Sequence, residues 1–466
     1  MPGASPLGFS QPTFGTDNQK AIPKDESGGS LCSLFPFQQI GIAFASAREA
    51  ALIADSPGLG KTAQAIGVIN GDPTLKKILI VCPASMRIPW QRELEKWLTR
   101  PLSVGVIGVN GEDQELLFTE SDVAIVNYDR LHCFTKKIAA NTYDLCVLDE
   151  CHYAKSLEAK RTRISLQIKA RRRLALSGTP VLNRPIELYP VLSWLAPKRW
   201  PATDWFAFAH RYCGAHHNGF GWDLSGASNL EELSARLRST VMIRRTKAEV
   251  LPELPPKIRT VIELIPTPGM KEALRRERTA YELPHLWVNH TLIDWDNLSV
   301  VRHQTALAKL PLVIDYVTEM LEGGTQKVVV FAHHRDVTLQ LGAGLSQYRP
   351  VTLIGGMGPQ ERQASIDTFH NNPGVRVFLG NIQAAGTGIT LAPASSHCVF
   401  AEMSWVPAEM TQAEDRLHRI GTRNCVTVHH LVLEGSLDAM MVRVLVKKQK
   451  ILDAVLEESA AVRTAP

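Results

Sequence analysis

The sequence predicts an α/β protein with two parallel-sheet lobes and a helical insertion between them. Short apolar, β-rich runs alternate with longer helical or polar stretches, which is typical of βαβ units whose sheet is covered on both faces. This alternation occurs in two separate series along the chain. The length of 466 residues agrees with this fold class, because it corresponds to roughly three units of ~150 residues each.

The chain opens with a stretch rich in glycine, proline and serine, residues 1–30. This stretch offers little apolar surface to offset the entropy of ordering, so we expect an extended or disordered arm. The first lobe is expected over residues 31–183. Its predicted strands cover residues 51–54, 78–81, 123–126, 145–148 and 173–176.

The composition changes over residues 184–270, where four tryptophans cluster. Leucines recur at helical spacing over residues 230–237, so we expect a helical insertion followed by a basic connector. The second lobe is expected over residues 271–466 and ends in a C-terminal helix that begins at Ser436. Its predicted strands cover residues 327–331, 351–354, 375–379, 398–401 and 426–433.

The composition also excludes several classes of protein. Hydrophobic residues make up 45% and charged residues 21% of the chain, which is ordinary globular usage and not that of a disordered or collagen-like protein. No apolar run approaches the ~20 residues of a membrane-spanning helix. No lysine or arginine precedes Lys20, and eight cysteines are scattered along the chain. We therefore expect no secretory signal, reduced thiols and an intracellular location, in the cytoplasm, nucleoid or nucleus.

A glycine-rich loop follows the first predicted strand and precedes a helix-forming stretch, residues 63–69. Strand, loop and helix in this order are the context that a phosphate loop (P-loop) requires, with glycines that let backbone N–H groups point at phosphate oxygens. Lys61 is expected to reach the β- and γ-phosphates, and the Thr62 hydroxyl is expected to hold Mg²⁺. Asp55 stands where the general pattern has its first glycine. The predicted nucleotide-binding residues are Asp55, Ser56, Pro57, Gly58, Leu59, Gly60, Lys61 and Thr62.

An acidic pair, Asp149 and Glu150, ends the predicted strand at residues 145–148. Parallel α/β sheets place ligand chemistry at the carboxyl ends of their strands. Asp149 is therefore expected to bind Mg²⁺ together with Thr62, and Glu150 to polarise the attacking water.

Three residues of the second lobe, Gln412, Arg416 and Arg419, have the spacing i, i+4 and i+7. This spacing predicts one stripe of a helix. The second series has no phosphate loop of its own, so the stripe is expected to face the γ-phosphate held by the first lobe. Arginines in that position contribute about 10³–10⁵ in rate. The predicted catalytic residues are Lys61, Asp149, Glu150, Arg416 and Arg419.

With further ordered motifs, the chain resembles the SWI/SNF-type DNA translocases of helicase superfamily two, and within them the annealing-helicase (HepA-related) branch. The resemblance covers about residues 35–456. It implies two RecA-like lobes, ATP and Mg²⁺ as cofactors, and a monomer that binds duplex, forked or single-stranded DNA mainly through phosphates. The motifs that carry it lie at residues 37–41, 83–85, 127–130, 177–180, 244–247, 331–334, 386–391 and 412–421.

The resemblance also assigns roles to single residues. Gln38 is implied to read adenine and Gly388 to contact ATP. Two departures from the family pattern, Glu402 in place of aspartate and Thr422 in place of glutamine, could weaken contacts within the second lobe. The residues implied to couple the ATP and DNA sites are His152, Ser177, Thr179 and Gln412. The implied DNA contacts are Pro83, Ser85, Asn127, Lys155, Arg244, Arg245, Thr387 and Trp405.

The implied function is that of an ATP-dependent DNA translocase, stimulated by duplex or forked DNA, that remodels or reanneals DNA. A strand-separating DNA or RNA helicase is the alternative, because a sequence does not reveal the wedge that splits a duplex. A scaffold without turnover is disfavoured by the intact predicted catalytic residues. A P-loop enzyme of small-molecule metabolism is disfavoured because it needs none of the other motifs. We expect no metal site besides Mg²⁺, since Cys213, His216 and His217 lack a fourth ligand at sensible spacing.

Overall fold

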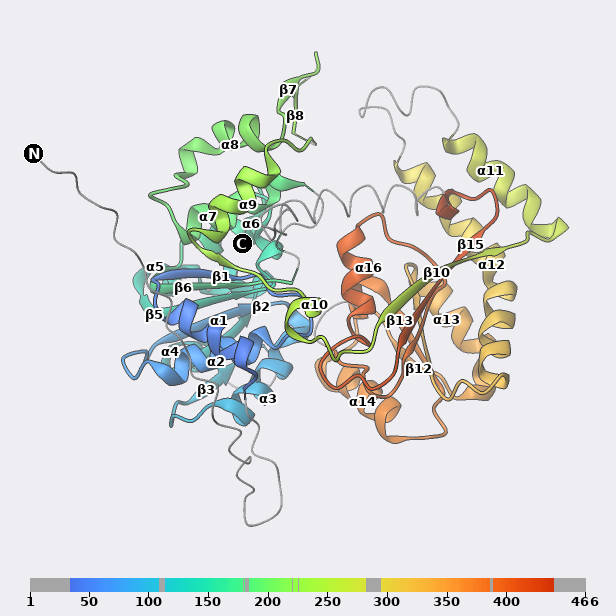
Figure 1. Cartoon of the computed structure of the whole chain (residues 1–466), viewed down its shortest axis with the longest axis horizontal. Coiled ribbons are helices and arrows are strands. Elements are labelled where there is room, and N and C mark those ends of the chain that lie inside the picture. The colour runs from blue at the N-terminus through green and yellow to red at the C-terminus, as the bar shows by residue number, and fades with distance from the viewer. Residues whose placement is uncertain are drawn as a thin grey trace, which may run out of the picture.

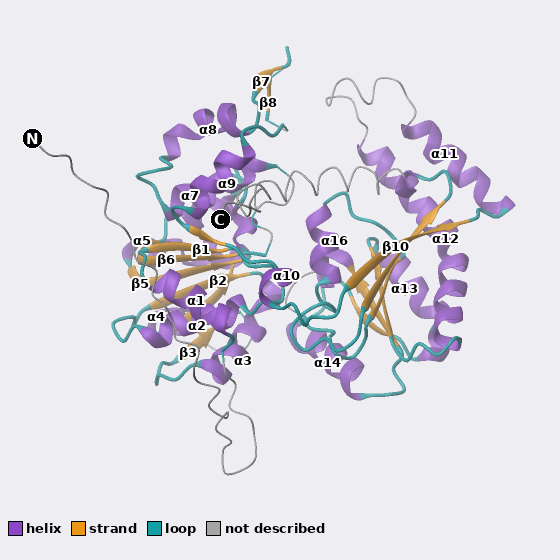
Figure 2. Cartoon of the chain, in the orientation of Figure 1, coloured by secondary structure: helices purple, strands orange, loops and turns teal. Residues whose placement is uncertain are grey.

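Two α/β lobes lie side by side in the computed structural model, and each is built on a sheet whose faces are covered by helices (Figure 1 and Figure 2). The expected N-terminal arm and nearly all of the expected C-terminal helix lie outside the described residues. The structure describes residues 34–108, 114–178, 180, 184–219, 221–224, 226–281, 295–385 and 389–439.

The first lobe contains a seven-stranded parallel sheet in the order β3-β4-β2-β5-β6-β1-β9. Neighbouring residues along its strands face opposite sides: Leu52 and Leu79 belong to one buried cluster, whereas Ile53 and Ile80 belong to another. Both faces are therefore apolar, which is why these strands read as continuous apolar runs. The strands are β1 (Ala50–Ile53), β2 (Ile78–Cys82), β3 (Val104–Val106), β4 (Val123–Asn127), β5 (Thr142–Asp149), β6 (Lys169–Leu176) and β9 (Met242–Ile243).

Helices cover both faces of this first sheet (Figure 2). α2 begins directly after the glycine-rich loop, as the helix-forming stretch at residues 63–69 predicts. The helices are α1 (Pro36–Ser46), α2 (Lys61–Gly71), α3 (Arg87–Trp97), α4 (Gln114–Glu120), α5 (Thr135–Ala140) and α6 (Lys160–Leu166).

The expected helical insertion extends the first lobe. Its side chains Trp194, Phe208 and Leu233 belong to the same buried cluster as Leu52 of the first sheet. After the insertion, β9 pairs with β1 and completes that sheet. The structure therefore extends the first lobe beyond residue 183, where we expected it to end. The elements of the insertion are α7 (Tyr189–Leu195), α8 (Trp205–Tyr212), the antiparallel hairpin of β7 (His216–His217) and β8 (Trp222–Asp223), and α9 (Leu230–Arg238).

The second lobe contains a six-stranded parallel sheet in the order β10-β15-β14-β11-β13-β12. Its edge strand β10 begins at Lys257, well before the expected boundary at residue 271. None of the side chains of β10 is fully buried, so the strand lacks the continuous apolar run that the other strands show. The strands are β10 (Lys257–Leu264), β11 (Val328–Ala332), β12 (Val351–Leu353), β13 (Val377–Asn381), β14 (His397–Phe400) and β15 (Val426–Leu433).

The connector between the lobes carries one short helix, α10 (Lys247–Val250), whose first turn is capped by Thr246 and Glu249. Within the described ranges, none of the helices combines the length and the apolarity needed to cross a bilayer. The helices of the second lobe are α11 (Lys271–Tyr281), α12 (Trp295–Glu322), α13 (Arg335–Gly344), α14 (Pro359–Asn371), α15 (Ile382–Ala385) and α16 (Pro407–Glu414).

Glu402, one of the two departures from the family pattern, fixes the carboxyl end of β11. One of its oxygens accepts the backbone N–H groups of His333 and His334, each at 2.8 Å, and the other lies 2.6 Å from the His334 ring. Burial alone would raise the pKa of Glu402, but the hydrogen bonds and charge of His334 lower it to about 2. Glu402 thus holds the segment after β11 through three contacts.

Glu402→Gln should destabilise the protein in a pH-dependent way. The pKa of this carboxyl falls from 4.5 in the unfolded chain to about 2 in the folded one, which corresponds to about 3 kcal/mol of stability. A carboxyl with a lowered pKa contributes fully above its unfolded pKa, and the contribution is lost as the pH falls from 4.5 towards 2. We expect the variant to be about 3 kcal/mol less stable at pH 7 and the difference to narrow below pH ~4, measured by urea unfolding. Glu361→Gln, at an exposed position, serves as the control. An equal loss of unfolding free energy at pH 7 and below pH ~4 would contradict the lowered pKa of Glu402.

Candidate functional site

The glycine-rich loop runs from β1 to the amino end of α2. Gly58 and Gly60 have φ values of 86° and 73°, a backbone region that glycine adopts without strain. The Lys61 ammonium lies over the loop and donates to the backbone carbonyl of Asp55 at 2.9 Å. Burial lowers the pKa of Lys61, while Glu150, Asp55 and Asp149 oppose that shift. The loop thus offers a lysine and a helix amino end to an anion.

Asp55 does not face the nucleotide side of this loop, contrary to the sequence prediction. Its carboxylate is completely buried and forms a salt bridge of 2.5 Å with Arg245. The Gln64 side chain donates to the same carboxylate at 2.9 Å. Because a buried carboxylate needs compensating partners, Asp55 holds the start of the loop through its neighbours and is not available to the phosphates.

Gln38 lies against the same loop from α1. Its amide nitrogen donates to the carbonyl of Leu59 at 3.2 Å, and its amide oxygen accepts the backbone N–H of Phe35 at 2.9 Å. The residue implied to read adenine is therefore next to the loop and buried.

The acidic pair ends β5, as predicted. Asp149 is buried, and its carboxylate accepts a hydrogen bond of 2.8 Å from the indole of Trp90 in α3. Burial and the charge of Glu150 raise the pKa of Asp149 to about 7. Glu150 has a φ of 47°, an uncommon conformation for a non-glycine residue that is often found at functional sites.

Two of the predicted coupling residues meet the acidic pair. The hydroxyl of Ser177 donates to Glu150 at 3.3 Å, and a ring nitrogen of His152 lies 3.1 Å from the same hydroxyl. Burial lowers the pKa of His152, while the charge of Glu150 opposes this shift. These contacts connect Glu150 to Ser177, the residue that follows β6.

The predicted helical stripe in the second lobe is only partly correct. α16 ends at Glu414, so Gln412 is helical, whereas Arg416 and Arg419 lie in the turns that follow. The Arg416 guanidinium nevertheless stays close to the helix, because it donates to the Gln412 carbonyl at 3.1 Å and to the Ile389 carbonyl at 3.3 Å. Tertiary contacts, and not helical periodicity, set the positions of the two arginines.

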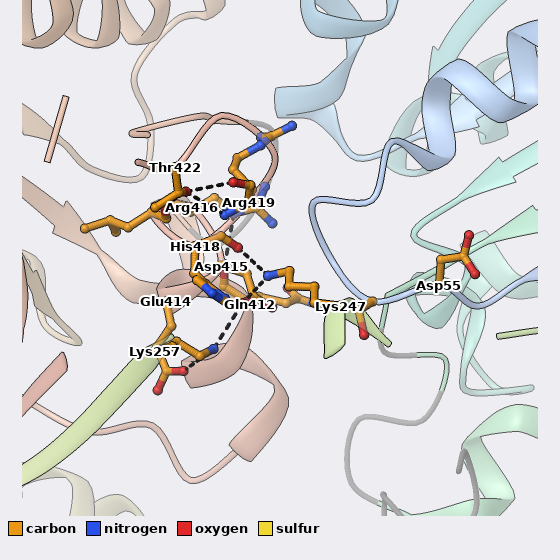
Figure 3. A network of polar contacts seen from close by, with 12 residues as sticks. Asp55, Lys247, Lys257, Gln412, Glu414, Asp415, Arg416, His418, Arg419 and Thr422 are labelled. Carbon is orange, nitrogen blue, oxygen red and sulfur yellow. Dashed lines mark hydrogen bonds and ion pairs between the residues drawn. The ribbon is translucent and has the colours of Figure 1, made fainter. Parts of the chain in front are cut away.

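Thr422, the second departure from the family pattern, closes the turn that carries Arg419. Its hydroxyl oxygen accepts the Arg419 backbone N–H at 3.0 Å and lies 2.7 Å from the Leu417 carbonyl. The guanidinium of Arg419 bonds to the Thr390 hydroxyl at 2.5 Å. The backbone and the guanidinium of Arg419 are thus both held within the second lobe, and Figure 3 shows Thr422 beside Arg419.

The two lobes meet at a shared cavity of about 160 Å³. The backbone of Arg419 lies so close to Gly58 that a Cβ atom on this glycine would be 2.6 Å from the Arg419 Cβ. The cavity is smaller than the roughly 300–1,000 Å³ of ligand pockets, so the present separation of the loop and the Arg419 turn leaves too little room for a whole nucleotide. The cavity brings together the first-lobe residues Lys61, Thr62, Asp149 and Glu150 and the second-lobe residues Thr390, Arg416 and Arg419.

The residues around this cavity fit a nucleoside triphosphate with Mg²⁺. A lysine, two arginines and a helix amino end supply the positive charge that phosphates need. Thr62 and Asp149 supply the oxygen ligands that Mg²⁺ prefers, and the raised pKa of Asp149 indicates a carboxylate that a cation would stabilise. The seam therefore offers the ligands for both cofactors implied by the sequence.

The predicted DNA contacts lie in different environments. Ser85 is partly exposed, whereas Pro83 and Asn127 are buried. Lys155 is 37% exposed and lies 3.6 Å from the carboxylate of Glu187.

The remaining predicted contacts are held inside the lobes. Arg244 donates to the Ala54 carbonyl at 2.7 Å, and the Trp405 ring lies under Arg302 at 5.9 Å. The sequence predicts that Arg245 contacts DNA. In the structure its side chain is 12% exposed and engaged by Asp55, so it is not available to a DNA phosphate. Thr179, Thr387 and Gly388 lie outside the described residues.

The sequence prediction missed several residues of the site. Trp90 and Thr390 hold Asp149 and Arg419, and Tyr128 donates to the Asp149 carbonyl at 2.9 Å. Tyr128 and Thr390 lie in the motifs at residues 127–130 and 386–391, but the sequence assigned neither residue a role, and Trp90 stands in no motif. The roles of all three arise from tertiary packing. Lys247 likewise lies in the basic run at residues 244–247, which marked it as part of the link between the lobes.

Comparison with known proteins shows similarity over nearly the whole described chain. Residues 37–291 match the SNF2-related domain family, and residues 308–421 match the helicase conserved C-terminal domain family. The chain is 38% identical over 442 residues to the human (Homo sapiens) DNA annealing helicase and endonuclease ZRANB3, covering 91% of this chain and 40% of that protein. It is 36% identical over 432 residues to the Xenopus tropicalis SWI/SNF-related matrix-associated actin-dependent regulator of chromatin subfamily A-like protein 1, covering 90% and 44%.

Among solved structures, the Sulfolobus solfataricus SWI2/SNF2 ATPase core in complex with dsDNA aligns with a TM-score of 0.44 and 22% identity. That alignment covers 93% of this chain and 96% of the solved chain. The chain spans about two fifths of the length of the curated relatives described above.

Lys61→Ala should abolish ATP hydrolysis, because no other ammonium lines the cavity within the described residues. The exposed Lys76→Ala, in the same lobe, serves as control. Circular dichroism should show that both variants are folded. Retained turnover in Lys61→Ala would refute the assignment of the phosphate loop.

Arg416→Ala should leave ATP binding intact and lower the turnover number at least a hundredfold, because the lost guanidinium faces charge that develops during the reaction. Turnover and nucleotide affinity are to be measured separately, beside the exposed Arg423→Ala as control. Full activity of Arg416→Ala would show that the second lobe supplies no catalytic charge through this residue.

Proposed function

Because this chain belongs to the family of SNF2-related proteins, we propose that it hydrolyses ATP between its two lobes and uses this cycle to translocate on DNA. In this proposal the motor remodels or reanneals DNA structures and modifies no covalent bond of the DNA. The proposal concerns the two-lobe motor, since the relatives are more than twice as long as the aligned segment.

The single observation that carries the proposal is the composition of the shared cavity. A phosphate loop and an acidic pair from one lobe face two arginines from the other across about 160 Å³. Burial lowers the pKa of Arg416, while Glu150, Asp415 and Asp149 raise it, so the charges of the two lobes interact across the seam. Because the charged groups are divided between the two lobes, the rate of hydrolysis depends on the distance between the lobes. A motor requires this dependence.

The chemistry follows from the side chains around the cavity. We propose that Lys61 binds the β- and γ-phosphates and that Thr62 and Asp149 hold Mg²⁺, which neutralises charge on the phosphates. In this proposal Glu150 orients and polarises the attacking water. Arg416 and Arg419 then stabilise the charge that develops on the transferred phosphoryl group, which requires the lobes to be closed.

The hydroxyl of Ser177 and the ring of His152 link this chemistry to the first lobe. The Ser177 hydroxyl lies 3.3 Å from Glu150 and 3.1 Å from the His152 ring, and that ring lies 3.4 Å from Glu150. We propose that they transmit the state of the cavity to the DNA-binding edge, where Ser85 and Lys155 supply a hydroxyl and an ammonium to phosphates. Phosphate contacts carry no sequence information, so the motor is proposed to act without sequence preference.

The proposal predicts hydrolysis that depends on DNA. ATP turnover is to be measured without polymer and with single-stranded DNA, duplex DNA, forked DNA and RNA, with Lys61→Ala as the blank. We expect duplex or forked DNA to stimulate turnover most, and DNA affinity to fall at least tenfold between about 50 and 200 mM salt. Stimulation by RNA alone, or unwinding of a forked duplex without displacement of a triplex strand, would favour a strand-separating helicase. A flat salt profile would point to stacking on bases.

A further inference from the structure

The connector between the lobes is fixed to the phosphate loop at Arg245. The guanidinium of Arg245 bonds both carboxylate oxygens of Asp55, at 2.9 and 2.5 Å. The backbone takes part as well, since the Arg245 N–H donates to Asp55 at 3.0 Å and the Ser56 N–H donates to the Arg245 carbonyl at 3.0 Å. Asp55 is completely buried, so this attachment is shielded from solvent and from salt.

Two residues further on, the connector is fixed to the arginine-bearing turn of the other lobe. The ammonium of Lys247 donates to Asp415 at 2.7 Å and to the backbone carbonyl of His418. Asp415 directly precedes Arg416, and His418 directly precedes Arg419. In Figure 3 the Lys247 side chain extends from the connector into this turn, with Asp55 on the side of the first lobe.

The acceptor of Lys247 is shared with a second lysine that belongs to the second lobe. Lys257, the first residue of β10, donates to the same oxygen of Asp415 at 3.0 Å and also pairs with Glu414 at 2.8 Å. Arg259 pairs with Glu414 at 2.6 Å. The side chains of Lys247 and Lys257 are 11% and 12% exposed, and that of Asp415 is 4% exposed. The two lysines donate to the same carboxylate oxygen, although Lys257 also pairs with Glu414, and only Lys247 stands two residues from the attachment to the phosphate loop.

Electrostatics agree with a tight, desolvated contact. Burial lowers the pKa of Lys247 to about 8, although Asp415 opposes this shift. Burial alone would raise the pKa of Asp415, but the charges of Lys247 and Lys257 and their hydrogen bonds lower it. The other cations and titratable groups around Lys247 are Lys257, Arg419 and His418. The pair is therefore largely removed from water, and each partner stabilises the charge of the other.

We propose that residues 245–247 act as a strut that sets the position of Arg416 relative to the phosphate loop, with Lys247 and Asp415 as positioning residues for catalysis. Two residues of extended chain span at most ~7 Å, so the separation of Asp55 and Asp415 is limited to this span plus the reach of the Lys247 side chain. Movement of the arginine turn away from Gly58, which nucleotide entry requires, must therefore either pivot on this segment or break the Lys247–Asp415 pair. This inference rests on the proposed ATPase function.

Two matched substitutions test the strut. Lys247→Met and Lys257→Met each remove one buried ammonium from the same oxygen of Asp415. We expect Lys247→Met to lower kcat for ATP at least tenfold with KM changed less than threefold, and Lys257→Met to lower kcat less than threefold. Lys247→Arg should recover kcat to within threefold of the unaltered protein. Equal losses in the two methionine variants, or a loss confined to KM, would overturn the strut.

A double variant separates positioning from a loss of fold. If Lys247 acts through Arg416, Lys247→Met should lower kcat no further in the Arg416→Ala background, because the two changes then remove one effect. Additive losses would show that Lys247 acts elsewhere. Thermal unfolding checks that each protein is folded. If Lys247→Met is not folded, Asp415→Asn is tested in its place. Absence of turnover in the unaltered chain would refute the proposed function itself, whereas normal turnover with an inert Lys247→Met would refute only the strut.

Discussion

The architecture of the seam depends on the buried ion pair between Asp55 and Arg245. A carboxylate with no exposed surface is tolerated only when charged and polar partners surround it, and Arg245 and Gln64 supply them. Asp55, the first residue of the phosphate loop, therefore holds the loop in position. The same ion pair fixes the connector beside the loop. Breaking this pair would leave a charge buried without compensation and would release the loop and the connector together.

The remaining charges at the seam follow from how the lobes face each other. The acidic pair lies between Lys61 on its own lobe and the arginine turn on the opposite lobe. Burial shifts the pKa of Lys61 and Arg416 downwards and that of Asp149 upwards, so each charge relies on the others for stabilisation. Such a site is sensitive to small displacements, because Coulomb interactions are strong where water is excluded.

The phosphate loop and most of the strands could be predicted from the sequence because they are local patterns, whereas β3, β9 and β10 were not predicted. Strands buried on both faces read as apolar runs, and the order of strand, loop and helix around Lys61 needs no distant partner. The rest depends on tertiary distances. Arg245 has the composition of a phosphate contact but meets Asp55, β10 is an edge strand without an apolar run, and Arg416 leaves the helix at a capped turn. Trp90 looks like any core residue until its indole is seen on Asp149.

The way in which the connector joins the two sheets has a mechanical consequence. It leaves the first sheet through β9, which pairs with β1 over two residues, and enters the second through β10, which pairs with β15 over eight. When the two lobes are pulled apart, the load passes along these edge ladders, and the ladder at β9 has fewer hydrogen bonds to lose. Strain between the lobes is therefore expected to reach the phosphate loop, which the connector contacts at Arg245, before it disturbs the second sheet.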